Sequence, residues 1–247
     1  MTNDFNEVHR NERDKRIVLD LEKHIYKVDE IIDCDSVTNV VGSCFTPFDA
    51  DYWAARKATA ACPAEVIKAQ WEEKARIARE LGTELHARIE KHYLGEAPSP
   101  EALSEKAFNL FRKFAAEHPL TPYRTEWTIF SEEHRLAGTL DFLAINDNGK
   151  FHIYDWKRST KVVDASGLPN LANYGKFAHA PIPHVPDTTY HHYALQLSFY
   201  RHILAEKYGI LVESAHLGVF HPELDRYYLV KVPYLHDEVK SLLQLRL

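Results

Sequence analysis

The sequence predicts an α/β fold in which helices cover both faces of a mixed central sheet. Apolar residues recur at helical spacing through the first half of the chain, and the period changes to two after residue 122. A helix then separates three strand-like runs from two more, and an amphipathic segment ends the chain. We expect one domain over residues 1–247, with an N-terminal helical part at about 36–118 and a sheet core at about 122–247.

Composition excludes several classes of protein. With 30 Lys+Arg against 36 Asp+Glu, the net charge of −6 argues against binding nucleic acid or anionic membrane through bulk charge. No run approaches the roughly 20 apolar residues of a membrane span, and the polar N-terminus has no apolar signal segment. We therefore expect an intracellular protein, cytoplasmic by default, with a nuclear or viral setting equally compatible. Its three cysteines, Cys34, Cys44 and Cys62, match no zinc pattern.

The N-terminal part contains a strand pair and three helices. A strand at 24–28 has its partner at 30–32, and Asp35 or Ser36 caps a short helix after them. A long helix at 63–93 carries one apolar stripe, formed by Ile67, Trp71, Ala75, Ala78, Leu81, Leu85 and Ile89. Another starts after Ser99-Pro100, ends near His118-Pro119 and directs four residues to the core: Leu103, Ala107, Leu110 and Phe114.

The C-terminal part contains the sheet core. Strands are predicted at 123–130, 136–145 and 150–156, the last two joined by a hairpin turn with Asn148-Gly149. Residues 158–188 lack periodicity and are rich in proline and glycine, which is typical of a functional or mobile loop. A helix at 189–208, strands at 214–220 and 226–232, and a helix at 235–245 follow.

Two carboxylates and a lysine mark a candidate catalytic centre. Asp155 and Lys157 lie two apart at the end of a strand, so both side chains face the same side of the sheet. Asp141 lies across the hairpin from them. Two carboxylates beside a lysine form a Mg²⁺ site with a cation ready to meet phosphate. An ordinary Asp–Lys salt bridge at a strand end explains these residues equally well on their own.

Three other residues lie where they could join this centre. His86 lies one step off the apolar stripe of its helix, from where an imidazole reaches a site beneath the helix. Gln196 and Tyr200 lie four apart and share one helical face. Taken alone, the histidine is typical of a surface or satisfied core residue, and the other two are typical of packing.

Taken together, these pieces resemble the PD-(D/E)XK nuclease superfamily in its RecB-like exonuclease branch. The matching segments are GTELH, EWTIF, GTLDFL, YDWK and QLSFY, which span residues 82–200 in the family's order. The resemblance is strongest to mitochondrial genome-maintenance exonucleases and their viral and phage relatives. It implies a restriction-endonuclease-like fold. One departure is Leu140, which replaces the family's nominal proline and leaves the following carboxylate in place.

The resemblance also implies a role for each motif residue. Asp141 and Asp155 would ligate one or two Mg²⁺ or Mn²⁺ ions, His86 and the Trp156 carbonyl would be further ligands, and Glu126 would help to hold metal or water. Among the remaining motif residues, Lys157 would position or deprotonate the attacking water and stabilise charge on the phosphate, while Gln196 and Tyr200 would orient the lysine or the substrate. Some relatives hold an iron–sulfur cluster through one early and three late cysteines. No cysteine follows Cys62, so we expect no such cluster.

A basic loop beyond Lys157 is the predicted nucleic-acid contact. Residues 157–176 hold four basic residues against one acid, a local balance of +3. Arg158, Lys161, Tyr174 and Lys176 combine cations with an aromatic ring, which suits phosphates and stacked bases of a single strand. An ordinary solvated loop is the equally weighted alternative. Arg56 and Lys57 beside Trp53 form a weaker second patch, and the adjacent His191 and His192 are left out of the ligand set because they do not share a helical face.

Together with the resemblance, these residues predict a metal-dependent DNA exonuclease acting on single-stranded DNA or free DNA ends. A structure-specific or nicking endonuclease on the same fold is an alternative, and so is a nucleic-acid-binding module without catalysis. The expected partners are DNA and proteins of replication or recombination, with no membrane partner.

Overall fold

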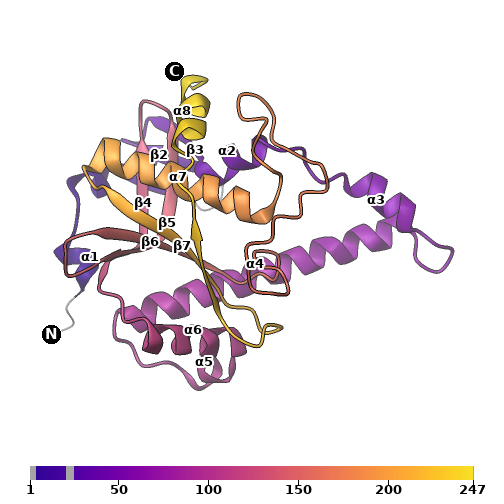
Figure 1. Cartoon of the computed structure of the whole chain (residues 1–247), viewed down its shortest axis with the longest axis horizontal. Coiled ribbons are helices and arrows are strands. Elements are labelled where there is room, and N and C mark those ends of the chain that lie inside the picture. Colours follow the sequence, from indigo (N-terminus) through magenta and orange to yellow (C-terminus); the bar gives the residue numbers. More distant parts are fainter. Residues whose placement is uncertain (1–3, 21–24, 247) are drawn as a thin grey trace.

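The computed structural model describes residues 4–20 and 25–246. It is an α/β fold with a mixed eight-stranded sheet flanked by helices, which confirms the predicted fold class (Figure 1). The strands are β1 (Ile17–Asp20), β2 (Ile25–Val28), β3 (Ile32–Ser36), β4 (Pro122–Ser131), β5 (Leu136–Ile145), β6 (Phe151–Lys157), β7 (Val212–Val219) and β8 (Tyr228–Val232). The α-helices are α1 (Phe5–Val8), α2 (Val37–Ser43), α3 (Ala50–Lys57), α4 (Ala64–Tyr93), α5 (Pro100–Ser104), α6 (Lys106–Glu117), α7 (Thr189–Tyr208) and α8 (His236–Gln244).

The sheet runs in the order β1-β2-β3-β5-β6-β7-β8, with β4 paired on β5. The pairs β3–β5 and β6–β7 are parallel, and the other neighbours are antiparallel. β1 to β3 belong to this same sheet, so the predicted sheet core at 122–247 omits its first three strands. The sequence pattern did not predict β1, because a strand of four residues is too short to show a clear alternation of apolar and polar residues.

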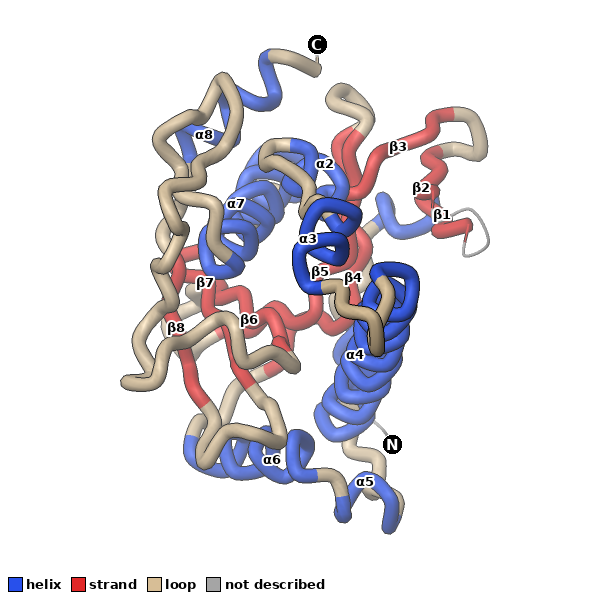
Figure 2. Tube along the Cα trace, turned by 90° about the vertical axis from the view of Figure 1, so that its right-hand side faces the viewer, coloured by secondary structure: helices blue, strands red, loops and turns tan. Residues whose placement is uncertain are grey.

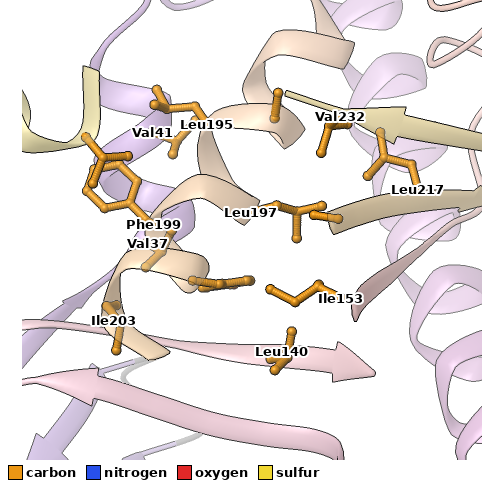
Figure 3. Close-up of a cluster of buried hydrophobic side chains, with 14 of the residues drawn as sticks. Val37, Val41, Leu140, Ile153, Leu195, Leu197, Phe199, Ile203, Leu217 and Val232 are labelled. Atoms are coloured by element: carbon orange, nitrogen blue, oxygen red, sulfur yellow. The ribbon is translucent and has the colours of Figure 1, made fainter. Parts of the chain in front are cut away.

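The helices form two layers, one on each face of the sheet (Figure 2). On one face α2, α7 and α8 pack on β5 to β8, and Figure 3 shows the side chains of α2 and α7 meeting those of the strands. On the other face α4 and α6 enclose a smaller aromatic core that includes Phe111, Phe142 and Trp156. Because helices cover both faces, nearly every residue of β5 is buried. Across 4–20 and 25–246, the structure contains no helix with the length and apolar character that a membrane crossing requires.

The hairpin of β5 and β6 fixes the register of the two aspartates. The turn is closed by a hydrogen bond from the Gly149 amide to the Asn146 carbonyl, and Gly149 has a φ of 71°, as the Asn-Gly signal predicts. In this register Phe142 pairs with Tyr154, which places Asp141 opposite Asp155. The helix at 189–208 and the strand at 136–145 also have the predicted bounds.

The predicted helix after Ser99-Pro100 and the predicted strand at 30–32 differ from the structure. The helix after Ser99-Pro100 is divided into α5 and α6, because the Glu105 side chain accepts a hydrogen bond from the Phe108 amide and begins a new helix there. Leu103 is consequently 41% exposed and does not enter the core. The partner strand at 30–32 begins only at Ile32, because the chain turns through Glu30 with a φ of 61°. His24, the predicted first residue of β2, lies outside the described residues.

The N-terminal half of α4 extends beyond the sheet, together with α3 (Figure 1). Ala75 and Ala78, members of the predicted apolar stripe, are therefore exposed, whereas Leu85 and Ile89 are buried where the helix crosses the sheet. We call residues 50–81 the α3–α4 arm. Beyond Lys157, residues 158–188 contain neither helix nor strand, as predicted. Isolated bridges and main-chain hydrogen bonds hold this segment, and Val162, Ile182 and Val185 are buried in the larger core.

Candidate metal and catalytic centre

One helix and two neighbouring strands bring three possible ligands together. His86 of α4 places its Nδ1 atom 3.6 Å from Oδ1 of Asp141 and 3.7 Å from Oε1 of Glu126. One ligand atom from each of the three lies within 4.8 Å of the others, a group that could hold a metal ion. Glu126 and Asp141 face each other across β4 and β5, in the register that pairs Trp127 with Leu140.

The backbone at Glu126 supports a functional role for this residue. Its φ of 44° lies in the left-handed region, which residues other than glycine rarely adopt, least of all within a strand. Such strain costs on the order of 1–3 kcal/mol and persists where the surrounding structure fixes it, often at functional sites. The Glu126 side chain is 33% exposed, so its carboxylate lies at the mouth of the group.

Main-chain atoms of Trp156 orient two of the three possible ligands. The Trp156 amide donates a 2.7 Å hydrogen bond to Oδ2 of Asp141, and its carbonyl accepts one of the same length from Nε2 of His86. The indole itself is buried in the aromatic core. In this arrangement the Trp156 carbonyl holds the imidazole, and its predicted role as a metal ligand stays a prediction.

Asp155 and Lys157 form a buried ion pair beside the group. The Nζ atom of Lys157 lies 2.6 Å from Oδ2 of Asp155, and the two side chains are 14% and 2% exposed. The predicted alignment of these two side chains on one side of the strand is confirmed. In this arrangement Oδ2 of Asp155 faces the lysine, and the predicted role of Asp155 as a metal ligand stays a prediction.

Helix α7 contributes side chains to the centre from the face of the sheet that carries the larger core. Nε2 of Gln196 donates a 3.0 Å hydrogen bond to the Tyr200 hydroxyl, so the predicted pair does share one face. Tyr200 is buried and packs on Gly138, where an added Cβ would lie 2.7 Å from its Cε1 atom. Sequence reasoning missed Tyr193, whose ring centroid lies 4.3 Å from Nζ of Lys157. Its position three residues before Gln196 was the available signal.

Burial shapes the electrostatics of the centre. Burial raises the pKa of Asp141 above its ordinary value, although His86 and Lys157 oppose this change. Burial likewise raises the pKa of Asp155 to about 6, against the lowering effect of the Lys157 ammonium. Burial disfavours a charged His86, but the Asp141 and Glu126 carboxylates outweigh it and raise its pKa to about 9. The centre thus concentrates three carboxylates in a poorly solvated place, where a divalent cation would offset their mutual repulsion.

The basic loop divides into buried and exposed parts. Arg158 is 13% exposed and lies 3.9 Å from Oε1 of Glu105, so its guanidinium serves the contact between β6 and the start of α6. Lys161, Tyr174 and Lys176, by contrast, line one open pocket of about 430 Å³ at the start of α7. The Tyr174 ring is 91% exposed, as a base-stacking surface requires.

The second basic patch lies on the α3–α4 arm. The Arg56 guanidinium lies over the Tyr52 ring, 5.8 Å from its centroid. The Lys57 ammonium lies over the Trp71 ring, 5.7 Å from its centroid. Trp53 is 39% exposed beside them. The adjacent histidines at the start of α7 bind local partners: His191 contacts the Thr188 hydroxyl, and His192 contacts Asp187.

Comparisons with known proteins give little further information. No protein-family model matches the chain, and no curated protein matches it. Among solved structures, the crystal structure of SSO0001 is similar with a TM-score of 0.31 and 17% sequence identity, over 85% of this chain and 73% of that chain. A likeness of this strength carries no argument about activity.

Proposed function

We propose that the protein is a Mg²⁺- or Mn²⁺-dependent deoxyribonuclease that degrades single-stranded DNA or free DNA ends. The observation that carries this proposal is the convergence of His86, Glu126 and Asp141 next to the buried Asp155–Lys157 pair. A metal group of oxygen-rich ligands with a lysine beside it matches the needs of phosphodiester hydrolysis. The order of the motifs, which resembles RecB-like exonucleases, supports the same conclusion.

The donor set fits a hard divalent cation. Carboxylate oxygens suit Mg²⁺ and Mn²⁺, and the single imidazole is a ligand that Mn²⁺ accepts. Asp141, Glu126 and His86 would hold the ion, and Asp155 would join them by sharing its carboxylate between ion and lysine. When bound, the ion supplies Lewis-acid polarisation of the phosphate and a more acidic water.

The chain's own groups would do the rest. The Lys157 ammonium, buried and fixed on β6, would face the scissile phosphate and stabilise the negative charge that builds on its oxygens. Gln196 and Tyr200, joined by their hydrogen bond, would limit the space around the lysine and exclude water. Lys161, Lys176 and Tyr174 would contact the strand beyond the centre through phosphate attraction and base stacking.

The experiment is digestion of linear and circular single-stranded DNA with Mn²⁺ or Mg²⁺, with and without EDTA, for the wild type and Asp155→Ala. The proposal expects metal-dependent loss of linear DNA by the wild type alone, with circles intact. Degradation that persists in Asp155→Ala would contradict the assigned centre. Cleaved circles would favour the endonuclease alternative, and binding without cleavage would favour a non-catalytic module.

A further inference from the structure

The Lys157 ammonium has two neighbours of different kinds. On one side lies the Asp155 carboxylate at 2.6 Å, and on another lies the face of the Tyr193 ring at 4.3 Å from the centroid. An ammonium over a tyrosine face is attracted by the ring quadrupole, and the attraction strengthens where water is excluded. Lys157 is only 14% exposed, so this contact is largely desolvated.

The two neighbours respond differently to a bound cation. The Asp155 carboxylate is the group that a divalent ion would compete for, because hard cations take carboxylate oxygens. An aromatic ring is no ligand for Mg²⁺ or Mn²⁺, so its hold on the ammonium does not depend on occupancy of the centre. Tyr193 is therefore the neighbour whose contact with the ammonium would stay the same if Asp155 also held an ion.

The position of Tyr193 is well fixed. It lies on the 20-residue helix α7, whose next residues Ala194 and Leu195 are buried in the larger core. Spacings of three and four place Tyr193, Gln196 and Tyr200 along one side of the helix. The same rigid surface thus carries the ring over Lys157 and the hydrogen-bonded pair beside it. Within 4–20 and 25–246, the structure shows no hydrogen bond to the Tyr193 hydroxyl, so the ring face is its contact with the centre.

We propose that Tyr193 is a positioning residue: its ring holds the Lys157 ammonium in the place where the scissile phosphate is bound. The inference rests on the proposed nuclease function for its catalytic meaning. The contact itself has a readout that needs no activity. The ring, not the hydroxyl, is the required group, so phenylalanine replaces tyrosine and leucine does not.

The test compares Tyr193→Phe with Tyr193→Leu. Single-turnover and steady-state cleavage of a linear oligonucleotide with Mn²⁺ give kcat and KM. Carbon-13 NMR spectra of the lysine-labelled protein without metal give the ring-current displacement of the chemical shift of the Lys157 ε-methylene. The signal is assigned by its loss in Lys157→Arg. Tyr234→Leu is the matched control, because it removes a similar contact of α7, Arg201 over the Tyr234 ring at 4.1 Å, outside the centre. We expect Tyr193→Leu to lower kcat about 10- to 30-fold with KM unchanged and to abolish the displacement. Tyr193→Phe and Tyr234→Leu should retain both the wild-type kcat and the ring-current displacement.

Two kinetic results would overturn the inference: unchanged kcat in Tyr193→Leu, or an equal loss of kcat in Tyr193→Phe. Unchanged kcat with a raised KM would indicate that Tyr193 contacts the substrate instead. A lysine displacement that survives Tyr193→Leu would also overturn it. If the wild type degrades no DNA, the proposed nuclease function fails. The spectra then decide by themselves whether Tyr193 holds Lys157.

Discussion

His86 Nε2 donates a 2.7 Å hydrogen bond to the carbonyl oxygen of Trp156, a residue 70 positions further along the chain. The bond leaves Nδ1 facing the carboxylates of Asp141 and Glu126. A histidine held by one ring nitrogen presents the other in a fixed direction, an arrangement typical of metal-binding histidines. Helix α4 and strand β6 are thereby joined at the candidate metal site itself.

This geometry predicts that metal binding releases a proton from His86. With its pKa raised to about 9, His86 is protonated at neutral pH, and an ion at Nδ1 must displace that proton. Apparent Mn²⁺ affinity should rise about tenfold per pH unit between about pH 7 and 8. Titration calorimetry in buffers of different ionisation enthalpy measures both the affinity and the proton count. An affinity independent of pH in this range would contradict the role of His86.

A bound ion should also stabilise the fold. A ligand at about 100 times its Kd adds about 2.7 kcal/mol to the free energy of unfolding. For a chain of this size we expect Tm to rise by about 5–10 °C with Mn²⁺ and to return with EDTA. Asp141→Asn, which keeps the shape and an acceptor for the Trp156 amide, should lose this rise, whereas Asp147→Asn in the exposed hairpin turn should keep it. Equal rises in both variants would place the metal elsewhere.

In the basic loop, Lys161 and Lys176 should contribute to binding of DNA, whereas Arg158 should serve mainly to hold the fold. Removing Lys161 and Lys176 together should weaken binding of a labelled single strand and reduce the salt slope by about 1.4, since each phosphate contact contributes about 0.7. Arg158→Ala should change the slope less, because Arg158 faces Glu105. Fluorescence anisotropy with Asp155→Asn as the background avoids cleavage. A larger slope change for Arg158→Ala than for the lysine pair would reverse this assignment.

Close packing of Tyr200 on Gly138 should make that glycine irreplaceable. In Gly138→Ala the new methyl group would meet the buried ring at 2.7 Å, and overpacking of this kind costs about 1–3 kcal/mol of unfolding free energy. Cleavage should fall as well, because Tyr200 and its partner Gln196 are displaced. Gly82→Ala is the control: nothing lies within 4 Å of its Cβ, and the helix should gain about 0.5–1 kcal/mol. Denaturant unfolding compares the two, and a stable Gly138→Ala would refute the packing.

Local sequence patterns predicted the strands and the helix that position the candidate centre. They did not predict features that depend on contacts between residues far apart in the sequence. The bounds of β5 and α7 follow from a hairpin signal and a sustained apolar pattern. The spacing of Asp155 and Lys157 predicted their shared direction, because side chains alternate along a strand. The pairing of Arg158 with Glu105 joins residues distant in sequence, and no local pattern predicts it. Exposure of Ala75 and Ala78 depends on where α4 leaves the sheet, which the apolar stripe does not encode.

The most direct test of the proposed centre is single-turnover cleavage of linear single-stranded DNA by Lys157→Met, with Mn²⁺ binding measured on the same preparation. Methionine keeps much of the buried stem but removes the ammonium that faces Asp155 and Tyr193. We predict that Mn²⁺ affinity is retained while the cleavage rate falls about 100- to 1000-fold, the loss typical of removing one electrostatic stabiliser of a transition state. A variant that binds Mn²⁺ and cleaves within about tenfold of the wild type would contradict the catalytic role of Lys157.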